Sequence, residues 1–243
     1  MAATSTATLA NGLVLDARRG VFLRASRTLA VADLHLGYAW AKRTRGALLP
    51  VTDDDTTQRL AELQRTYRPQ RLVVLGDIVH EALALPALEK LLREFCDRLG
   101  RTSELIFCFG NHDRHLEKRV RDWQLPVTCQ RQLTLDGHEL LHGDMLPCAT
   151  DAEVFTLSSA PAVSRIIGHE HPAITLGDGV ATRVKCPAFL VANDLLVLPA
   201  FSSWAAGCEF GRQPFLGPLA RAAKFHTAFA CVGPRLLRLP LVK

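Results

Sequence analysis

Five short segments of the chain carry side chains that can bind a metal ion, and each segment follows a run of apolar residues. The segments are Asp33-Leu34-His35, Gly76-Asp77, Gly110-Asn111-His112-Asp113, His142-Gly143-Asp144 and Gly168-His169-Glu170-His171. Together they offer carboxylate, imidazole and amide groups but no thiolate. This set of ligands suits a catalytic site for manganese, iron or zinc better than a structural zinc site.

The apolar runs before these segments are predicted to be strands. They are Thr28–Ala32, Arg71–Leu75, Leu105–Phe109, Glu139–Leu141 and Arg165–Ile167. In an open α/β sheet, ligands bind beyond the carboxyl ends of the strands, so we expect five strand ends to converge on one site. In extended backbone, residues i and i+2 point the same way. Asp33 and His35 should therefore face one metal ion together, as should His169 and His171 across the site.

Each segment on its own has a simpler explanation. A Gly-Asp pair after a strand is commonly a turn, and the Asn and Asp of Gly110–Asp113 also favour turns and helix caps. Independent turns, however, give no reason for all five segments to follow apolar strands in this order. The combination therefore predicts a metal site.

The rest of the chain predicts helices around these strands and a change of pattern after Gly177. The predicted helices are Asp53–Tyr67, Pro86–Leu99 and Arg114–Trp123. The predicted later strands are Val180–Val184, Phe189–Ala192, Leu195–Leu198, Thr227–Val232 and Leu236–Leu239. An α/β fold with a two-sheet core and helices outside accounts for both parts. We expect one domain, residues 1–243, because no Gly- or Ser-rich linker divides the chain.

The composition limits the class of protein. A hydrophobic share of 48% supports a large core and excludes a disordered chain. No apolar run is long enough to span a membrane, and no secretory signal is visible, so a cytoplasmic location is expected. The 7 cysteines include no C-x-x-C pair, which favours reduced, buried thiols. A net charge of +5 suits an anionic partner but also fits many other enzymes.

The ordered set of five segments resembles the calcineurin-like metallophosphoesterase superfamily. The resemblance implies a two-sheet β-sandwich flanked by helices, with two divalent metal ions. The implied ligands of the first ion are Asp33, His35, Asp77 and His171, and those of the second are Asp77, Asn111, His142 and His169. Asp77 would bridge the two ions. His112 would be the catalytic acid beside the leaving group, and Asp113 would orient its ring.

A narrower resemblance covers most of the chain. It is carried by Asp33-Leu-His-Leu-Gly-Tyr38, Arg43-Thr-Arg-Gly46, Leu75-Gly-Asp-Ile-Val-His80, Gly168-His-Glu-His-Pro172 and Leu198-Pro-Ala-Phe-Ser-Ser-Trp204. These motifs are similar to those of the bacterial ligase-associated DNA damage response phosphoesterases. The resemblance implies a manganese-dependent endonuclease on single-stranded or damaged DNA. It also implies association with an ATP-dependent DNA ligase, a helicase and an exonuclease.

Two metal ions would clamp the attacking and leaving oxygens of a phosphoester and lower the pKa of a bridging water, so that hydroxide is available near neutral pH. Their imidazole ligands need an acceptor on the other ring nitrogen, for which Asp144 and Glu170 are candidates, although both also fit solvated loop carboxylates.

Four residues beside the ligand segments are expected to bind the substrate: Arg43, Arg45, His80 and Arg114. With Lys42 and Lys118, the arginines would hold a phosphodiester backbone, and no base-reading motif is visible. Two other functions remain open. The chain could hydrolyse a small nucleotide or another phosphorylated metabolite, or it could be a non-catalytic scaffold for protein contacts. The complete set of ligands and His112 argue against the scaffold.

Overall fold

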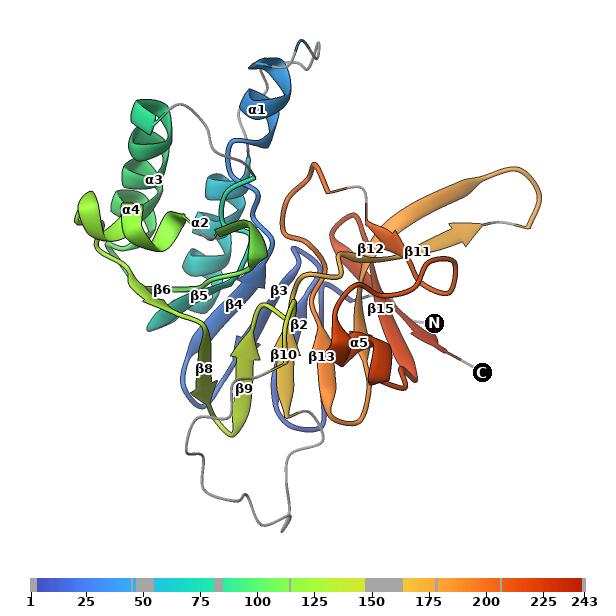
Figure 1. Ribbon diagram of the computed structural model, residues 1–243. Coiled ribbons are helices and arrows are strands. Elements are labelled where there is room, and N and C mark those ends of the chain that lie inside the picture. Colours follow the sequence, from blue (N-terminus) through green and yellow to red (C-terminus); the bar gives the residue numbers. More distant parts are fainter. Residues whose placement is uncertain are drawn as a thin grey trace.

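Two β-sheets packed face to face form the centre of the molecule, with helices outside them (Figure 1). This computed structural model describes residues 4–44, 46, 55–80, 85–113, 115–146, 164–177, 179–205 and 207–241. The N-terminal and C-terminal parts lie close together, since Thr4 pairs with Leu236 in an isolated antiparallel bridge. The first strands of the chain and the last are therefore parts of the same packed unit.

Within the described residues, the strands of the first sheet lie side by side in the order in which they occur in the chain. They are β1 (Thr6–Thr8), β2 (Leu13–Asp16), β3 (Gly20–Leu23), β4 (Thr28–Ala32), β5 (Arg71–Leu75), β6 (Glu104–Cys108) and β7 (Thr128–Gln130). β1 to β4 pair antiparallel, whereas β4 to β7 pair parallel. The carboxyl ends of β4, β5 and β6 therefore lie at the same edge.

The second sheet has the order β14-β11-β12-β13-β10-β9-β8, and β12 also pairs with β15 and, through it, β16. Its strands are β8 (Gln132–Leu135), β9 (His138–Leu141), β10 (Arg165–Ile167), β11 (Pro172–Gly177), β12 (Arg183–Val191), β13 (Leu195–Val197), β14 (Cys208–Glu209), β15 (Thr227–Val232) and β16 (Arg235–Pro240). β9 and β13 both run parallel to β10. The chain after β13 meets the end of β4, because Ala200 and Ala32 form a parallel bridge.

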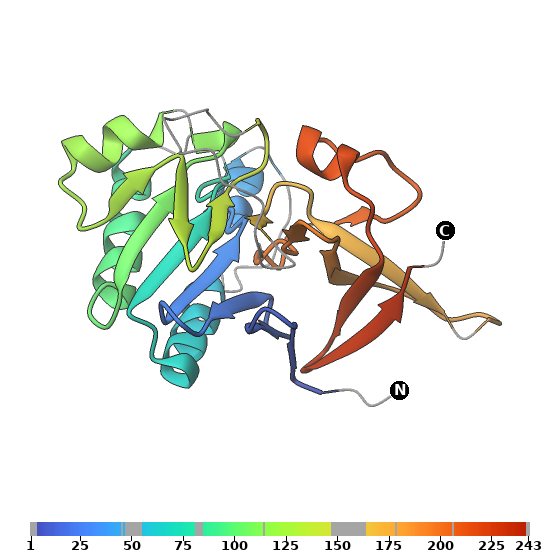
Figure 2. The ribbon, with the colours of Figure 1, turned by 90° about the horizontal axis from the view of Figure 1, so that it is seen from below.

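Most of the helices in the described part of the chain cover the outer faces of the two sheets, whereas the first projects beyond their edge (Figure 1). The helices are α1 (Tyr38–Thr44), α2 (Thr56–Tyr67), α3 (Leu85–Leu99), α4 (Leu116–Asp122) and α5 (Pro218–Ala222), with a 3-10 turn at Asn111–Asp113. Figure 2 shows α2, α3 and α4 on the side of the first sheet that faces away from the orange and red strands. α5 packs on the outer face of the second sheet, where Ala220 joins the cluster around Ile167 and Val197.

Alternate side chains of β4 pack into two different parts of the core. Leu29 and Val31 pack with leucines of α2 and α3, whereas Ala30 and Ala32 belong to the cluster between the two sheets. Successive side chains of a strand point to opposite faces, so a fully apolar strand is buried on both sides.

The structure confirms the α/β class with two sheets and flanking helices, and it corrects several of the predicted elements. β4, β5, β10 and β15 have the predicted bounds. The strand predicted at Val180–Val184 is wrong, because β12 begins at Arg183 and Val180 lies exposed in the turn before it. α4 begins at Leu116, so the predicted helix Arg114–Trp123 is shorter than expected.

Candidate metal centre

The five ligand segments meet at the edge where parallel strands of both sheets end. Asp33 follows β4 directly, and His142 follows β9 directly. Asp77 lies one glycine after β5, His169 lies one glycine after β10, and Asn111 opens the 3-10 turn after β6. The convergence that the sequence predicts is therefore present in the fold.

A first group of donor atoms belongs to Asp33, His35, Asp77 and His171, and all four lie within 4.8 Å of one another. The Nε2 atoms of His35 and His171 are 3.3 Å apart. His171 Nε2 lies 3.5 Å from Asp33 Oδ1, and His35 Nε2 lies 3.9 Å from Asp77 Oδ2. Three of these residues are buried, so their lone pairs converge on a small volume away from bulk water.

A second group surrounds Nε2 of His142. This atom lies 3.2 Å from Asn111 Oδ1, 3.1 Å from His169 Nδ1 and 3.4 Å from Asp77 Oδ1. Asp77 thus presents one carboxylate oxygen to each group. His169 belongs to this second group and His171 to the first, so the two histidines of one segment separate.

The donors fit two divalent metal ions. Ligand atoms bound at about 2.0–2.2 Å from an ion lie about 3.0–3.6 Å from their neighbours in octahedral or tetrahedral geometry. The separations around Nε2 of His142 have this spacing, as do two of those in the first group, whereas His35 Nε2 and Asp77 Oδ2 lie slightly farther apart, at 3.9 Å. His142 Nδ1 lies 3.1 Å from the carbonyl oxygen of Leu75, to which it can donate, and this leaves Nε2 as the metal-binding atom. The acceptor is a backbone carbonyl, which has no signature in the sequence.

The ligand segments are not extended, so the alternation of a strand does not explain why Asp33 and His35 face the same group. Asp33, His35, Asp77, His169 and His171 all have left-handed backbone, with φ between 46° and 68°. Non-glycine residues in this region cost of the order of 1–3 kcal/mol each and tend to cluster at functional sites. The side chains converge because tight left-handed turns redirect the chain, and not because a strand continues.

Burial and charge set the protonation of the imidazoles. Burial lowers the pKa of His35 to about 3 and that of His169 to about 4, so both rings are neutral at pH 7, which is the form that binds metal ions. Burial also lowers the pKa of His142, but the carboxylates of Asp33 and Asp77 outweigh it and raise that pKa above its usual value. The two carboxylates therefore favour positive charge at this place.

His112 and Asp113 lie on the 3-10 turn beside the two donor groups. His112 is exposed, its ring centroid lies 6.3 Å from that of His35, and its backbone N–H lies 3.4 Å from Asp77 Oδ1. Asp113 is buried, and its two oxygens accept hydrogen bonds from the backbone N–H groups of Ile78 and Gly110, both at 3.0 Å. These contacts fix the turn that carries His112. An interaction of Asp113 with the His112 ring stays a prediction.

Glu170 holds the loop before α5 through its side-chain carboxylate. Its carboxylate accepts hydrogen bonds from the backbone N–H groups of Leu216, at 2.7 Å, and Gly217, at 2.6 Å. Burial of Glu170 is nearly complete, at 2% exposure. This residue therefore ties the loop before α5 to the ligand segment of His169 and His171.

The four predicted substrate-binding residues are described only in part. Arg43 lies exposed on α1, and His80 packs beside the centre, with its ring centroid 5.5 Å from that of His35. Arg45 and Arg114 lie outside the described residues. Their predicted roles therefore stay predictions.

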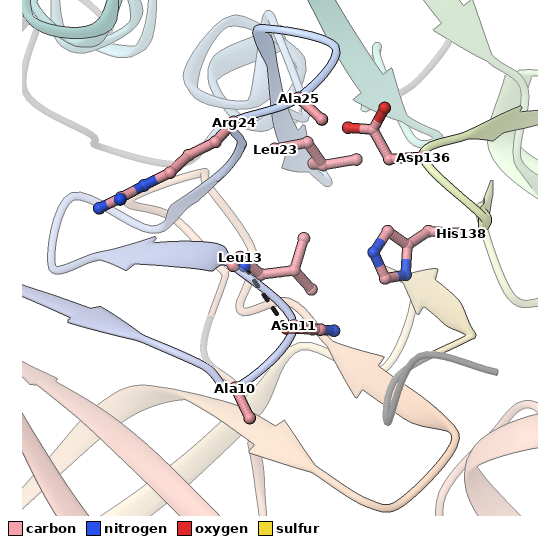
Figure 3. A pocket seen from close by; sticks show the side chains of 9 residues that line it. Ala10, Asn11, Leu13, Leu23, Arg24, Ala25, Asp136 and His138 are labelled. Carbon is pink, nitrogen blue, oxygen red and sulfur yellow. Dashed lines mark hydrogen bonds between the residues drawn. The ribbon is translucent and has the colours of Figure 1, made fainter. Parts of the chain in front are cut away.

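A cavity of about 430 Å³ lies away from this centre (Figure 3). It is lined by Asn11, Leu13, Leu23, Asp136 and His138, among others. His138 begins β9, whereas the ligand His142 follows its end, so the cavity is at the opposite edge of the sheet. The candidate ligands of the two metal ions, all of them in the described part of the chain, do not line it.

Comparison with known proteins agrees with the fold. Residues 26–173, more than half of the chain, match the family model of the calcineurin-like phosphoesterases. The match spans all five ligand segments, and the chain belongs to this family. It is a metal-dependent phosphoesterase.

The fold is also similar to the crystal structure of Pseudomonas putida nuclease MPE, with a TM-score of 0.68 and 24% sequence identity, over 97% of this chain and 100% of that chain. A search of curated proteins found no match. No helix in the described part of the chain is long and apolar enough to cross a membrane.

Proposed function

We propose that the protein is a two-metal phosphodiesterase that cleaves DNA strands internally, on single-stranded or damaged DNA, with manganese. The observation that carries the proposal is the position of Asp77, whose two oxygens face two separate groups of imidazole and oxygen donors. Asp77 could therefore contribute to the binding of two ions, which together would supply the two-metal chemistry used for in-line displacement at phosphorus.

In this proposal each predicted ligand keeps its role. The first ion would be held by Asp33, His35, Asp77 and His171, and the second by Asp77, Asn111, His142 and His169. The bound ions would neutralise charge on the phosphoryl oxygens and supply hydroxide from water near neutral pH. His112 donates a proton to the leaving oxygen, from an exposed position beside Asp77. Asp113 positions His112 by holding the 3-10 turn.

Three features support a nucleic-acid substrate. The similar solved structure is that of a nuclease. Exposed Arg43 lies on α1, which follows the His35 segment, and exposed Lys118 lies on α4, which follows Asp113. The narrower motif resemblance extends the proposal to a role in DNA repair, in the cytoplasm, together with a ligase, a helicase and an exonuclease.

Residues 1–243 act as one domain in this proposal. The strongest support is the bridge between Thr4 and Leu236, which joins the two ends of the described chain. The second sheet also takes strands from β8 to β16, well beyond the residues that match the family model.

The test compares two substrates with one purified protein. Manganese-loaded protein is assayed on single-stranded DNA and on a small chromogenic phosphodiester, with Asp77→Asn as the inactive control and Asp97→Asn, an exposed change on α3, as the matched active control. Internal cleavage of DNA with two bound metal ions supports the proposal. Turnover of the small substrate alone would favour the metabolite hydrolase, and inactivity on both with full metal content would favour the scaffold.

A further inference from the structure

A row of aromatic rings leads from the metal centre to the surface. The ring centroid of His35 is 5.5 Å from that of His80, which is 4.3 Å from that of Tyr38. The Tyr38 centroid is 5.8 Å from that of Trp204, and the planes of these two rings differ by only 13°. Tyr38 and Trp204 are therefore stacked on each other. The His80 ring lies between Tyr38 and the candidate metal ligand His35.

The row is fixed to the ligand segment by backbone hydrogen bonds. Tyr38 N–H donates to the carbonyl oxygen of His35 at 3.1 Å, and His80 N–H donates to that of Leu36 at 3.2 Å. Ser202 N–H donates to the carbonyl oxygen of Asp33 at 3.1 Å, and its hydroxyl accepts the N–H of Trp204 at 3.2 Å. Both stacked rings therefore have short connections to the residues that face the metal site.

Packing in the apolar core does not account for the stacked pair. In the described part of the chain, neither Tyr38 nor Trp204 belongs to an apolar cluster, and both are half-buried. Trp123, by contrast, packs against the cluster under α3 and α4. Two large aromatic rings held outside the core are typical of binding surfaces.

The charge beside the pair suits an anionic ligand. The ammonium group of Lys42 lies 5.4 Å from the centroid of the Tyr38 ring. Proteins that bind single-stranded nucleic acids combine such cations, which contact phosphates, with aromatic rings on which bases stack. A base in a duplex is already stacked between its neighbours, so an aromatic surface of this kind favours single strands.

We infer that Tyr38 and Trp204 form a stacking platform for a nucleobase of a single-stranded nucleic acid whose adjoining phosphodiester lies at the metal centre. This inference rests on the proposed function. It adds a physical source for a preference for single strands, and it assigns to Tyr38 and Trp204 a role in substrate specificity that is separate from metal binding.

The test uses two short single strands that differ only beside the central phosphodiester, where one has thymidines and the other has abasic residues. For manganese-loaded wild-type protein, we expect kcat/KM at the central linkage to be about 5- to 150-fold higher with bases, which corresponds to about 1–3 kcal/mol of stacking. Trp204→Ala should lower kcat/KM on the base-containing strand to the abasic value and leave the abasic value unchanged.

Three further variants make the result specific. Trp204→Phe keeps an aromatic face and should retain most of the preference. Tyr38→Leu, which keeps apolar volume but not the ring, should lose it, so the inference does not depend on one substitution. Trp123→Phe, which changes a half-buried ring packed against the core, should retain the preference in full.

Two results would overturn the inference and leave the proposed function in place. One is equal cleavage of both strands by the wild-type protein. The other is an equal loss on both strands in Trp204→Ala, which would mean that Trp204 only supports the segment of Asp33. Failure of the wild-type protein to cleave either strand would instead overturn the proposed function, and the platform with it.

Discussion

Gly76 leaves the space that the ring of His142 occupies. A Cβ atom added to Gly76 would lie 2.1 Å from His142 Nδ1, the atom that lies within hydrogen-bond distance of the Leu75 carbonyl. Gly110 borders the same ring, since its Cβ would lie 2.5 Å from Cδ2 of His142. Two glycines from neighbouring strand ends of the first sheet therefore admit an imidazole that comes from the second sheet.

Gly76→Ala should displace His142 and reduce metal binding. Gly211→Ala is the matched control, because both glycines have positive φ, at 70° and 81°, but nothing lies within 4 Å of a Cβ at Gly211. Left-handed backbone costs about 1–2 kcal/mol in either variant, so both should lose some thermal stability. Elemental analysis should show that only Gly76→Ala loses metal ions. Full metal content in Gly76→Ala would mean that the ring does not bind metal in this position.

The sequence predicts that the metal ligands come together at one edge of the sheet. It does not predict the backbone conformation that brings their side chains together. Parallel strands followed by polar residues place Asp33, Asp77 and Asn111 at one edge, and this follows from the order of motifs. The left-handed backbone of Asp33 and His35 was not predictable, since both residues would also fit an extended strand.

Other parts of the fold have no local sequence pattern from which they could be predicted. β2 and β3 are almost entirely buried and mostly apolar, so they lack the alternation of a half-buried strand. Arg18 and Arg19 between them resemble a basic surface group, yet Arg18 pairs with Asp16 at 2.7 Å and Arg19 donates to the carbonyl oxygens of Ala200 and Ser202. The rings of the aromatic row lie in motifs that carry the narrower resemblance, but these motifs are far apart in the chain, so the sequence does not predict that the rings come together.

His112→Ala tests the assignment of His112 as an acid. The exposed ring contributes no donor to either group in this proposal, so metal content should remain intact while turnover falls about 10²–10⁴-fold. The loss should be small for a substrate with a good leaving group, because such a group needs little protonation. Rates measured across phosphodiesters with leaving groups of increasing pKa give this dependence. Loss of metal together with activity would contradict the assignment.

Asp16 should make the stability of the protein sensitive to acid. Burial alone raises the pKa of Asp16, but hydrogen bonds from Arg18 and from the Tyr67 hydroxyl, the latter at 2.7 Å, outweigh it and lower that pKa below its ordinary value. A carboxyl with a lowered pKa in the folded state stabilises the protein above its unfolded-state pKa of about 4, and this contribution is lost as the pH falls through the lower folded-state pKa.

Urea unfolding of metal-free Asp16→Asn and wild-type protein measures this effect. The difference in unfolding free energy between the two should be largest at pH 7 and should shrink as the pH is lowered below about 4. A difference that is constant between pH 7 and pH 3 would show that the charge of Asp16 does not contribute, and that the substitution acts only through the shape of the side chain.

Charge reversal on the two helices beside the centre tests the path of the strand. Arg43 on α1 and Lys118 on α4 are both exposed. Each phosphate that such a residue binds releases counterions, so affinity for single-stranded DNA falls with salt with a log–log slope of about −0.7 per phosphate. Arg43→Glu with Lys118→Glu should weaken DNA binding and make the slope shallower by about 0.7 for each phosphate that is no longer bound. Hydrolysis of a small phosphodiester should be nearly unchanged, because that substrate reaches only the metal centre.

The matched control reverses two cations at the other end of the first sheet. Arg98 and Arg101 are exposed and precede β6, whereas the ligand segment follows it. Arg98→Glu with Arg101→Glu changes the net charge by the same amount but should leave the salt slope as it is. Equal weakening in both double variants would mean that DNA responds only to net charge, and equal losses on DNA and on the small phosphodiester would mean that Arg43 and Lys118 support the metal centre. Either result would remove the physical argument for a strand that crosses between α1 and α4.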